Sequence, residues 1–157
     1  MMQDMIFMNV KLKRPSKNLK NITLITNSVE ALIELSDKDD WNVFSTGGKL
    51  KKGSLSLVGP SAEKTIRSFH VDYAVCSSKG LDITRGITDS NEKDSEMKQA
   101  IFESAETKIL CVDSSKFDKI SLIKVGNVNE VDIIATDTEP SANWQEYLKR
   151  KNVELIY

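Results

Sequence analysis

The stretch from Val71 to Thr88 most constrains the fold, because a short apolar segment changes abruptly into a polar one that contains glycine. Residues 71–76 (VDYAVC) are mostly apolar and β-branched, a composition typical of a buried strand. Residues 77–88 (SSKGLDITRGIT) contain two glycines, several hydroxyl groups and three charged side chains. A buried strand that leads into such a loop is a frequent source of ligand contacts in open α/β sheets. We therefore expect this loop to form one wall of a small-molecule site.

Strand-like and helix-like segments alternate along the rest of the chain. Short apolar or alternating segments, typical of strands, lie at residues 5–8, 21–26, 41–45, 54–58, 108–112, 131–135 and 153–156. Helical spacing or capping signals occur at residues 29–35, 61–69, 89–107 and 141–151. This alternation predicts an α/β fold with a mainly parallel sheet flanked by helices. A chain of 157 residues is expected to form a single domain, residues 1–157.

Composition argues against several classes of function. The chain has 22 basic and 23 acidic residues, a balance that creates no overall field for nucleic acid or an anionic membrane. Cys76 and Cys111 lie inside strand-like segments and are expected to be buried thiols, and the single histidine is His70. We therefore expect neither a metal site nor a cofactor. No apolar run approaches the roughly 18 residues of a membrane span, so the expected location is the cytoplasm.

Small polar residues recur where the expected strands end, at residues 26–28, 46–48, 77–82 and 113–116. The carboxyl ends of parallel strands lie at one edge of a sheet, so these residues should meet there. Together they offer backbone N–H groups, hydroxyls, carboxylates and lysine ammonium groups, which suit a phosphorylated polyol. No catalytic triad, Gly-x-Ser-x-Gly elbow or nucleotide-binding glycine motif is present.

Each of these polar groups also has a purely local interpretation. Asn27 is a candidate N-cap with Glu30 three residues later, and the Gly47-Gly48 pair suits a tight turn as well as a close approach to a ligand. Lys116 pairs with Asp113 or binds an anion. The basic segment at residues 11–20 contacts nucleic acid or another anion, or is a solvated connection; the lack of interleaved aromatic residues favours the connection.

The order of several motifs resembles one known family. The motifs are Thr26-Asn-Ser28, Gly47-Gly48, Ser54-Leu-Ser-Leu-Val-Gly-Pro60, Asp72, Gly80-Leu-Asp82, Gly86-Ile-Thr88, Glu96-x-Lys98, Asp113-Ser-Ser-Lys-Phe117 and Ile134-x-Thr-Asp137. From about residue 22 to its end, the chain resembles the C-terminal effector-binding domain of the DeoR family of sugar-responsive bacterial transcriptional repressors.

The resemblance implies a fold similar to ribose-5-phosphate isomerase and the glucosamine-phosphate deaminases. It also implies a pocket for a phosphorylated sugar effector that modulates DNA binding by the intact repressor, usually an oligomer. The residues that match the family's pocket are Asn27, Ser28, Gly47, Gly48, Gly80, Asp82, Gly86, Thr88, Glu96 and Lys116. The helix-turn-helix domain usual in the family is absent from this chain, so DNA binding is expected only through such a domain. The first phosphate-binding loop is expected to be shortened, between residues 9 and 21.

Two other functions remain open at this stage. The first is a sugar-phosphate isomerase or deaminase, with Glu96 as the base and Lys116 or Lys79 near the phosphate. The second is a dimerisation module that no longer binds a ligand, an alternative motivated by the shortened loop. The leading prediction is a sensor domain without enzymatic activity.

Overall fold

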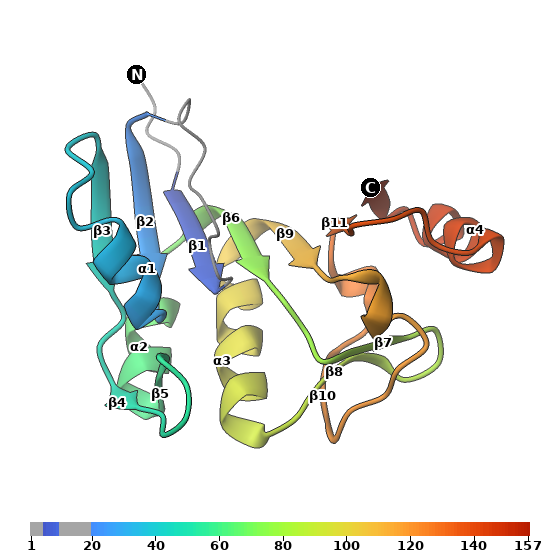
Figure 1. Ribbon diagram of the computed structural model, residues 1–157, viewed down its shortest axis with the longest axis horizontal. Coiled ribbons are helices and arrows are strands. Elements are labelled where there is room, and N and C mark those ends of the chain that lie inside the picture. Colours follow the sequence, from blue (N-terminus) through green and yellow to red (C-terminus); the bar gives the residue numbers. More distant parts are fainter. Residues whose placement is uncertain (1–4, 10–19) are drawn as a thin grey trace.

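A computed structural model describes residues 5–9 and 20–157 of the chain. Its centre is a seven-stranded sheet in which every neighbouring pair of strands is parallel (Figure 1). In order across the sheet, the strands are β12 (Glu154–Ile156), β11 (Ile133–Ala135), β9 (Ala105–Cys111), β6 (Val71–Cys76), β1 (Met5–Asn9), β2 (Ile22–Thr26) and β3 (Trp41–Ser45). The predicted α/β fold with a mainly parallel sheet is confirmed. Residues 10–19, which hold most of the basic segment and of the expected shortened loop, lie outside the described residues.

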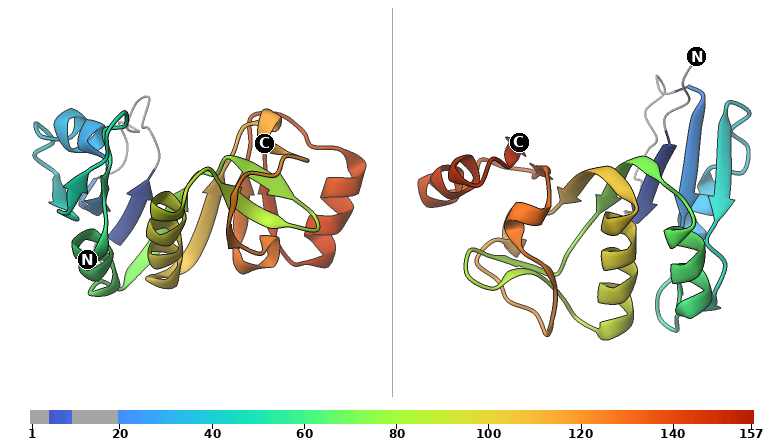
Figure 2. Two further views of the ribbon diagram at one scale, coloured as in Figure 1. Left: turned by 90° about the horizontal axis from the view of Figure 1, so that it is seen from below. Right: turned by 180° about the vertical axis from the view of Figure 1, so that it is seen from behind.

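The helices cover both faces of the sheet, as the two views of Figure 2 show. They are α1 (Val29–Glu34), α2 (Pro60–Arg67), α3 (Glu92–Glu103) and α4 (Ala142–Arg150), with two short 3₁₀ helices at Ser114–Lys116 and Val128–Glu130. Adjacent residues of β2 contribute to different cores, because side chains alternate across a strand. Leu24 packs with Leu35 and Trp41 on the α1 side, whereas Ile25 belongs to the larger core with Ile66 of α2.

The starts of the helices depend on a few capping residues. Ser28, not the predicted Asn27, is the N-cap of α1, and its Oγ accepts a hydrogen bond of 3.2 Å from the Ala31 N–H. Helix α2 begins at Pro60, one residue before the predicted Ser61, because proline suits the first helical turn. Helix α3 is shorter than the predicted segment 89–107. It starts after the N-cap Asn91 and is followed by β9, which begins at Ala105.

The stretch predicted as an open polar loop after β6 is instead largely a β-hairpin. Strands β7 (Gly80–Asp82) and β8 (Gly86–Asp89) pair with each other, and β8 also pairs with β10 (Ile123–Gly126), all antiparallel. Gly86 has a φ of 85° and its Cα faces the Gly126 backbone so closely that a side chain would collide with it. A side chain at Gly80 would likewise come within 2.5 Å of the Lys119 carbonyl oxygen. Both glycines therefore serve close packing of this small sheet.

A second small hairpin lies beside the start of α1. It consists of β4 (Lys49–Leu50) and β5 (Leu57–Val58), joined by residues 51–56. Backbone hydrogen bonds of 2.8 Å attach it to the turn after β2: Val29 N–H donates to the Leu55 carbonyl, and Leu57 N–H donates to the Asn27 carbonyl. Leu55, in the segment that joins the two strands, is 49% exposed. The hairpin is therefore tied to α1 by its backbone rather than by apolar packing.

Candidate functional site

A cleft of about 420 Å³ opens at the carboxyl edge of the parallel sheet. Four segments line it: the turn after β2, the β4–β5 hairpin, the residues after β6, and the segment from the end of β8 into α3. The lining residues are Asn27, Ser28, Glu30, Lys51, Ser54, Leu55, Ser56, Ser77, Lys79, Asp89, Ser90, Asp94 and Lys98. Most of these side chains end in a charged group or a hydroxyl. The cleft therefore suits a polar, charged ligand better than an apolar one.

The topology of the sheet explains why a cleft forms here. The chain places β2 and β3 on one side of β1 and β6, β9, β11 and β12 on the other. In open α/β sheets, ligands bind outside the carboxyl ends of the strands where the strand order reverses. Ser77 and Lys79 directly follow β6, one of the two strands at this reversal, and Asn27 follows β2 beside β1. The polar residues after β6 and β2 therefore meet, as their position in the sequence predicts.

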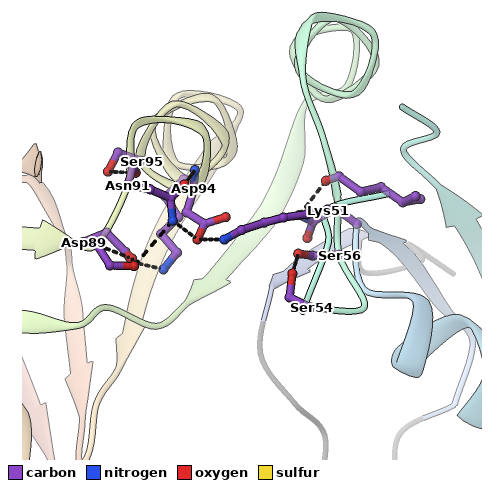
Figure 3. A network of polar contacts seen from close by, with 11 residues as sticks. Lys51, Ser54, Ser56, Asp89, Asn91, Asp94 and Ser95 are labelled. Carbon is purple, nitrogen blue, oxygen red and sulfur yellow. Dashed lines mark hydrogen bonds and ion pairs between the residues drawn. The ribbon is translucent and has the colours of Figure 1, made fainter. Parts of the chain in front are cut away.

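The α3 side of the cleft is built on a buried ion pair (Figure 3). The Lys98 ammonium contacts the Asp89 carboxylate, and the two side chains are only 9% and 1% exposed. Asp89 also accepts a hydrogen bond of 2.7 Å from the Ser90 N–H. Separating a buried pair by removing one partner typically costs about 3–5 kcal/mol, since the other charge stays buried and unpaired. Asp89 and Lys98 therefore form a rigid wall of the cleft.

A second ion pair crosses the cleft from the hairpin to the first turn of α3 (Figure 3). Lys51 contacts the Asp94 carboxylate, and their side chains are 28% and 21% exposed. Burial by itself would raise the pKa of Asp94, but hydrogen bonds from Lys51 and Asn91 outweigh it and hold the pKa below its usual value. Ion pairs with this degree of solvent contact contribute only about 0–1 kcal/mol. The pair is therefore much easier to break than the Lys98–Asp89 pair.

Asn27 carries a buried oxygen without a partner. Its side-chain N–H donates a hydrogen bond of 3.0 Å to the Leu57 carbonyl, which fixes the orientation of the amide. The opposite atom, Oδ1, is buried and has no hydrogen-bond partner within the described part of the chain. A buried acceptor without a donor costs about 1–3 kcal/mol. A ligand hydroxyl that reaches this oxygen would supply the missing hydrogen bond.

Lys79 is the cation of the cleft that is available to a ligand. Lys51 and Lys98 contact Asp94 and Asp89, whereas Lys79 forms no ion pair with any described carboxylate. Its side chain is exposed and its backbone N–H is held by the Thr88 carbonyl at 3.1 Å. An ammonium group on a fixed backbone at the reversal of the strand order is suited to binding a phosphate or carboxylate.

The structure brings two of the ten predicted pocket residues, Asn27 and Ser28, into the lining of this cleft. The other eight are Gly47 and Gly48 before β4, Gly80, Asp82, Gly86 and Thr88 in the β7–β8 hairpin, Glu96 on α3, and Lys116 in the first 3₁₀ helix. Several of these make internal contacts. Asp82 accepts hydrogen bonds from the N–H groups of Thr84 and Arg85, and the Thr88 hydroxyl oxygen accepts one from Ser121 N–H at 2.8 Å. Glu96 is exposed to solvent. A role for these eight in ligand binding stays a prediction.

The two ion pairs that cross or border the cleft were not predicted from the sequence. Their residues are Lys51, Asp89, Asp94 and Lys98. One signal for Lys98 was present, because it stands three residues before Ile101 and therefore near the apolar stripe of the predicted helix. A lysine in that position lies either at the edge of the apolar face of the helix, with its ammonium in solvent, or in the core beside an acidic partner. No local signal indicated that the hairpin would face α3.

Residues 5–9 and 20–157 contain neither a candidate metal site nor a candidate membrane span. No group of three or more His, Cys, Asp or Glu side chains in this part of the chain is arranged to hold a metal ion. In the same residues, no helix is long and apolar enough to cross a membrane.

An all-parallel sheet with a charged, hydroxyl-rich cleft at the reversal of its strand order is the arrangement typical of ligand-binding α/β domains. Residues 11–138 match the family model of the DeoR C terminal sensor domain, and the chain belongs to this family. The resemblance inferred from the motifs is therefore confirmed.

Relatives of this chain are transcriptional regulators. It is 39% identical over 134 residues to the uncharacterized HTH-type transcriptional regulator YulB of Bacillus subtilis, covering 85% of this chain and 52% of that protein. It is 34% identical to the HTH-type transcriptional repressor GlcR of the same organism, over 88% of this chain and 54% of that protein. Identity to the glycerol-3-phosphate regulon repressor of Escherichia coli is 25%, over 88% and 55%. The chain thus spans about half the length of these relatives.

Proposed function

We propose that this chain is the effector-sensing part of a transcriptional regulator of carbohydrate metabolism, and that its cleft binds a phosphorylated sugar. The observation that carries the proposal is the Lys79 ammonium, which pairs with none of the described carboxylates and lies at the strand-order reversal, in a cleft lined mostly by hydroxyl and charged groups. Lysine binds phosphate as a point charge, and carboxylate and amide oxygens accept hydrogen bonds from sugar hydroxyls. The printed names of relatives, such as the glycerol-3-phosphate regulon repressor and the L-fucose operon activator of Haemophilus influenzae, agree with this ligand class.

The direct test is thermal unfolding in the presence of sugar phosphates and of the corresponding free sugars. A ligand at 100 times its Kd stabilises the folded state by about 2.7 kcal/mol, which is easily measured as a rise in Tm. We expect one or more phosphate esters to raise the Tm, while their unphosphorylated forms have little effect. If no phosphate ester shifts the Tm, the proposal is wrong for this chain.

A pair of lysine variants tests whether the cleft is the binding site. Lys79→Gln should weaken binding of the phosphate ester about tenfold, the effect expected from losing one charge-assisted contact. Lys116→Gln is the comparison variant, because the family resemblance places Lys116 in the pocket although it does not line the cleft; we expect it to leave the affinity unchanged. Equal losses in both variants, or a loss only in Lys116→Gln, would place the ligand elsewhere.

The proposal includes the absence of enzymatic activity. Glu96, the residue matched to the base of the related isomerases, is exposed on α3 and does not line the cleft. We expect no interconversion of aldose and ketose phosphates, measured by coupled assay. Turnover that disappears in Glu96→Gln would instead identify an isomerase-like enzyme.

The proposal also concerns assembly and location. We expect a homo-oligomer in the cytoplasm that binds operator DNA through a helix-turn-helix domain. Two relatives are named as HTH-type transcriptional regulators, which supports the expected kind of DNA-binding domain. This chain by itself should not retard operator DNA in a gel-shift assay. Sedimentation velocity of this chain at micromolar concentration should show a species larger than a monomer.

A further inference from the structure

The two ion pairs of the cleft differ in how easily a ligand group can replace one of the two partners. Lys98 and Asp89 are almost fully buried, whereas Lys51 and Asp94 retain contact with solvent. Figure 3 shows Lys51 extending from the hairpin to Asp94 on the first turn of α3, across the open space between the two elements. Replacing one partner of a partly exposed ion pair by a ligand group costs little free energy, since such pairs are weak. Replacing a buried partner leaves a charge without solvent or partner.

The charge of a phosphate ester cannot be balanced by Lys79 alone. A phosphate monoester carries a charge of about −1.5 to −2 near pH 7, because its second pKa is about 6. Lys79 supplies one positive charge, and the other two lysines of the lining are engaged with Asp89 and Asp94. Among the lining residues that the structure describes, a second cation becomes available when one of these lysines leaves its carboxylate. Lys51 is the one that can do so at low cost.

We propose that Lys51 determines the specificity of the cleft for phosphate: the ligand's phosphate takes the Lys51 ammonium from Asp94, and the freed carboxylate accepts a hydrogen bond from a sugar hydroxyl. This inference rests on the proposed function. It explains why the cleft is electrically balanced when empty, with each of these carboxylates next to its own lysine. A neutral sugar has no group that can displace Asp94, so the pair also discriminates against unphosphorylated ligands.

The surroundings of the pair suit such an exchange. The Asn91 side-chain N–H donates to Asp94 Oδ2 at 2.7 Å, and the Asp94 N–H donates to Asn91 Oδ1 at 3.0 Å. These contacts keep Asp94 in place when Lys51 leaves. Lys51, in contrast, stands on a hairpin whose Leu50 and Leu55 side chains are 53% and 49% exposed. The Lys51 side chain can therefore turn toward a ligand while Val58 of the same hairpin stays in the core.

The test is titration calorimetry with inorganic phosphate, the group shared by every ligand of the proposed class. Asp94→Asn removes the internal competitor and should tighten phosphate binding about fivefold, while Lys51→Gln should weaken it about tenfold through the loss of a charged contact. Tightening in Asp94→Asn together with weakening in Lys51→Gln supports the inference, because reduced repulsion of the anion alone would tighten binding in Asp94→Asn without a loss in Lys51→Gln. Unchanged or weaker binding by Asp94→Asn overturns the inference.

Matched controls separate the inference from the proposed function. Glu103→Gln removes a carboxylate from an exposed ion pair with Arg67 of α2, outside the cleft, and should leave phosphate affinity unchanged. If phosphate binds wild type but Asp94→Asn gains nothing, the exchange is wrong and the phosphate site stands. If neither wild type nor Asp94→Asn binds phosphate, both are wrong. Binding by Asp94→Asn alone supports the exchange, with the internal pair outcompeting the free anion.

A second readout does not depend on affinity. In the empty cleft, the Asp94 carboxylate contacts the Lys51 ammonium, whereas in the proposed complex Lys51 contacts the phosphate and no longer contacts Asp94. The pKa of Asp94, followed by the NMR shift of its carboxyl carbon, should therefore rise when saturating phosphate is added. A pKa that stays constant would mean that Lys51 has not left Asp94.

Discussion

The residues after β2 and β6 differ from those after β9 and β11 in what their polar groups contact. All four stretches contain hydroxyl and acidic or amide side chains and lie at the carboxyl edge of the same sheet. After β2 and β6, Asn27, Ser28, Ser77 and Lys79 line a cleft of about 420 Å³. After β9 and β11, the Ser115 N–H donates to Asp113 at 2.9 Å and the Ser114 N–H donates to Asp137 at 2.6 Å.

The difference shows that a polar strand end becomes a site only when another element stands opposite it. The hairpin and the start of α3 face each other across the first region and supply Lys51, Asp89, Asp94 and Lys98. In the second region, the turn after β9 satisfies its own polar groups, and Lys116 lies 3.6 Å from Asp113 within it. Polar groups that already form hydrogen bonds within the protein gain less free energy from binding a ligand.

The largest expected difference between the two regions is in the reactivity of their cysteines. Cys76 is the last residue of β6, and Cys111 is the last residue of β9. Burial raises the pKa of Cys76 to about 12, and it also raises the pKa of the half-buried Cys111. Because the thiolate is the reactive form, only about one Cys76 thiol in ten thousand is ionised at pH 8. A thiol-reactive dye should label Cys111 first and Cys76 only after unfolding, as peptide mass mapping would show. Equal labelling rates in the folded protein would contradict the burial of Cys76.

The next contrast is between two lysines. Lys98→Ala leaves the Asp89 carboxylate buried without a partner and should lower the free energy of unfolding by about 3–5 kcal/mol. Lys116→Ala, in the second region, should change it by less than about 1 kcal/mol, because the Lys116–Asp113 pair is exposed to solvent. Urea denaturation measures both. The double variant Lys98→Met/Asp89→Leu should recover much of the stability lost in Lys98→Ala. Equal losses in Lys98→Ala and Lys116→Ala would mean that the two ion pairs do not differ in their contribution to stability.

Thr88 tests the boundary of the first region. Its buried hydroxyl oxygen accepts a hydrogen bond from Ser121 N–H, so Thr88→Val should cost about 1–3 kcal/mol of stability. Phosphate affinity should not change, because Thr88 does not line the cleft. Thr84→Val, at an exposed position of the same hairpin, is the control and should be nearly neutral. A loss of affinity in Thr88→Val without a loss of stability would extend the site into the β7–β8 hairpin.

Much of the fold was predictable because it depends on local sequence. The strands Val71–Cys76 and Trp41–Ser45 were predicted with the bounds that the structure shows, since each is an apolar stretch ended by small polar residues. Strand β10 (Ile123–Gly126) was missed, and the β7–β8 hairpin was predicted as a loop. Strand β10 depends on antiparallel pairing with residues more than 30 positions away, such as Lys124 with Thr88, whereas β7 and β8 pair with each other over a short stretch that contains glycines and charged residues. Such pairing leaves no strong local pattern.

The candidate site was predictable only in part for a similar reason. Asn27 and Ser28 were found because they follow a strand, which fixes the edge of the sheet where they lie. Lys51 and Asp94 are 43 positions apart and meet only because the hairpin packs beside the start of α3. In the sequence, each is one of many charged residues in a polar segment. The pairing of charges across a cleft is a property of the tertiary structure.

The smallest expected effect is the pH dependence of the unfolding free energy, to which carboxylates of both regions contribute. The pKa of Asp94 is lower in the folded chain than its ordinary value of 3.8, despite burial, because Lys51 and Asn91 donate hydrogen bonds to it. The folded state therefore binds this proton less tightly than the unfolded state. The ionised carboxylate stabilises the fold above about pH 4, and this contribution disappears as the pH falls through the folded-state pKa. For this partly exposed group it should be below about 1 kcal/mol.

Asp113 and Asp137 also have lowered pKa values, held down chiefly by hydrogen bonds from Ser115 and Ser114. All three carboxylates therefore lose their contribution over the same acidic pH range, and single variants must separate them. The difference in unfolding free energy between wild type and Asp94→Asn should shrink between pH 5 and pH 2, which lies around the ordinary carboxylate pKa of about 3.9. Because Asp113 and Asp137 are exposed, the corresponding differences for Asp113→Asn and Asp137→Asn should depend more on added salt. If the difference for Asp94→Asn depended on salt as strongly as those for Asp113→Asn and Asp137→Asn, the Lys51–Asp94 pair would be as exposed to screening by salt as Asp113 and Asp137.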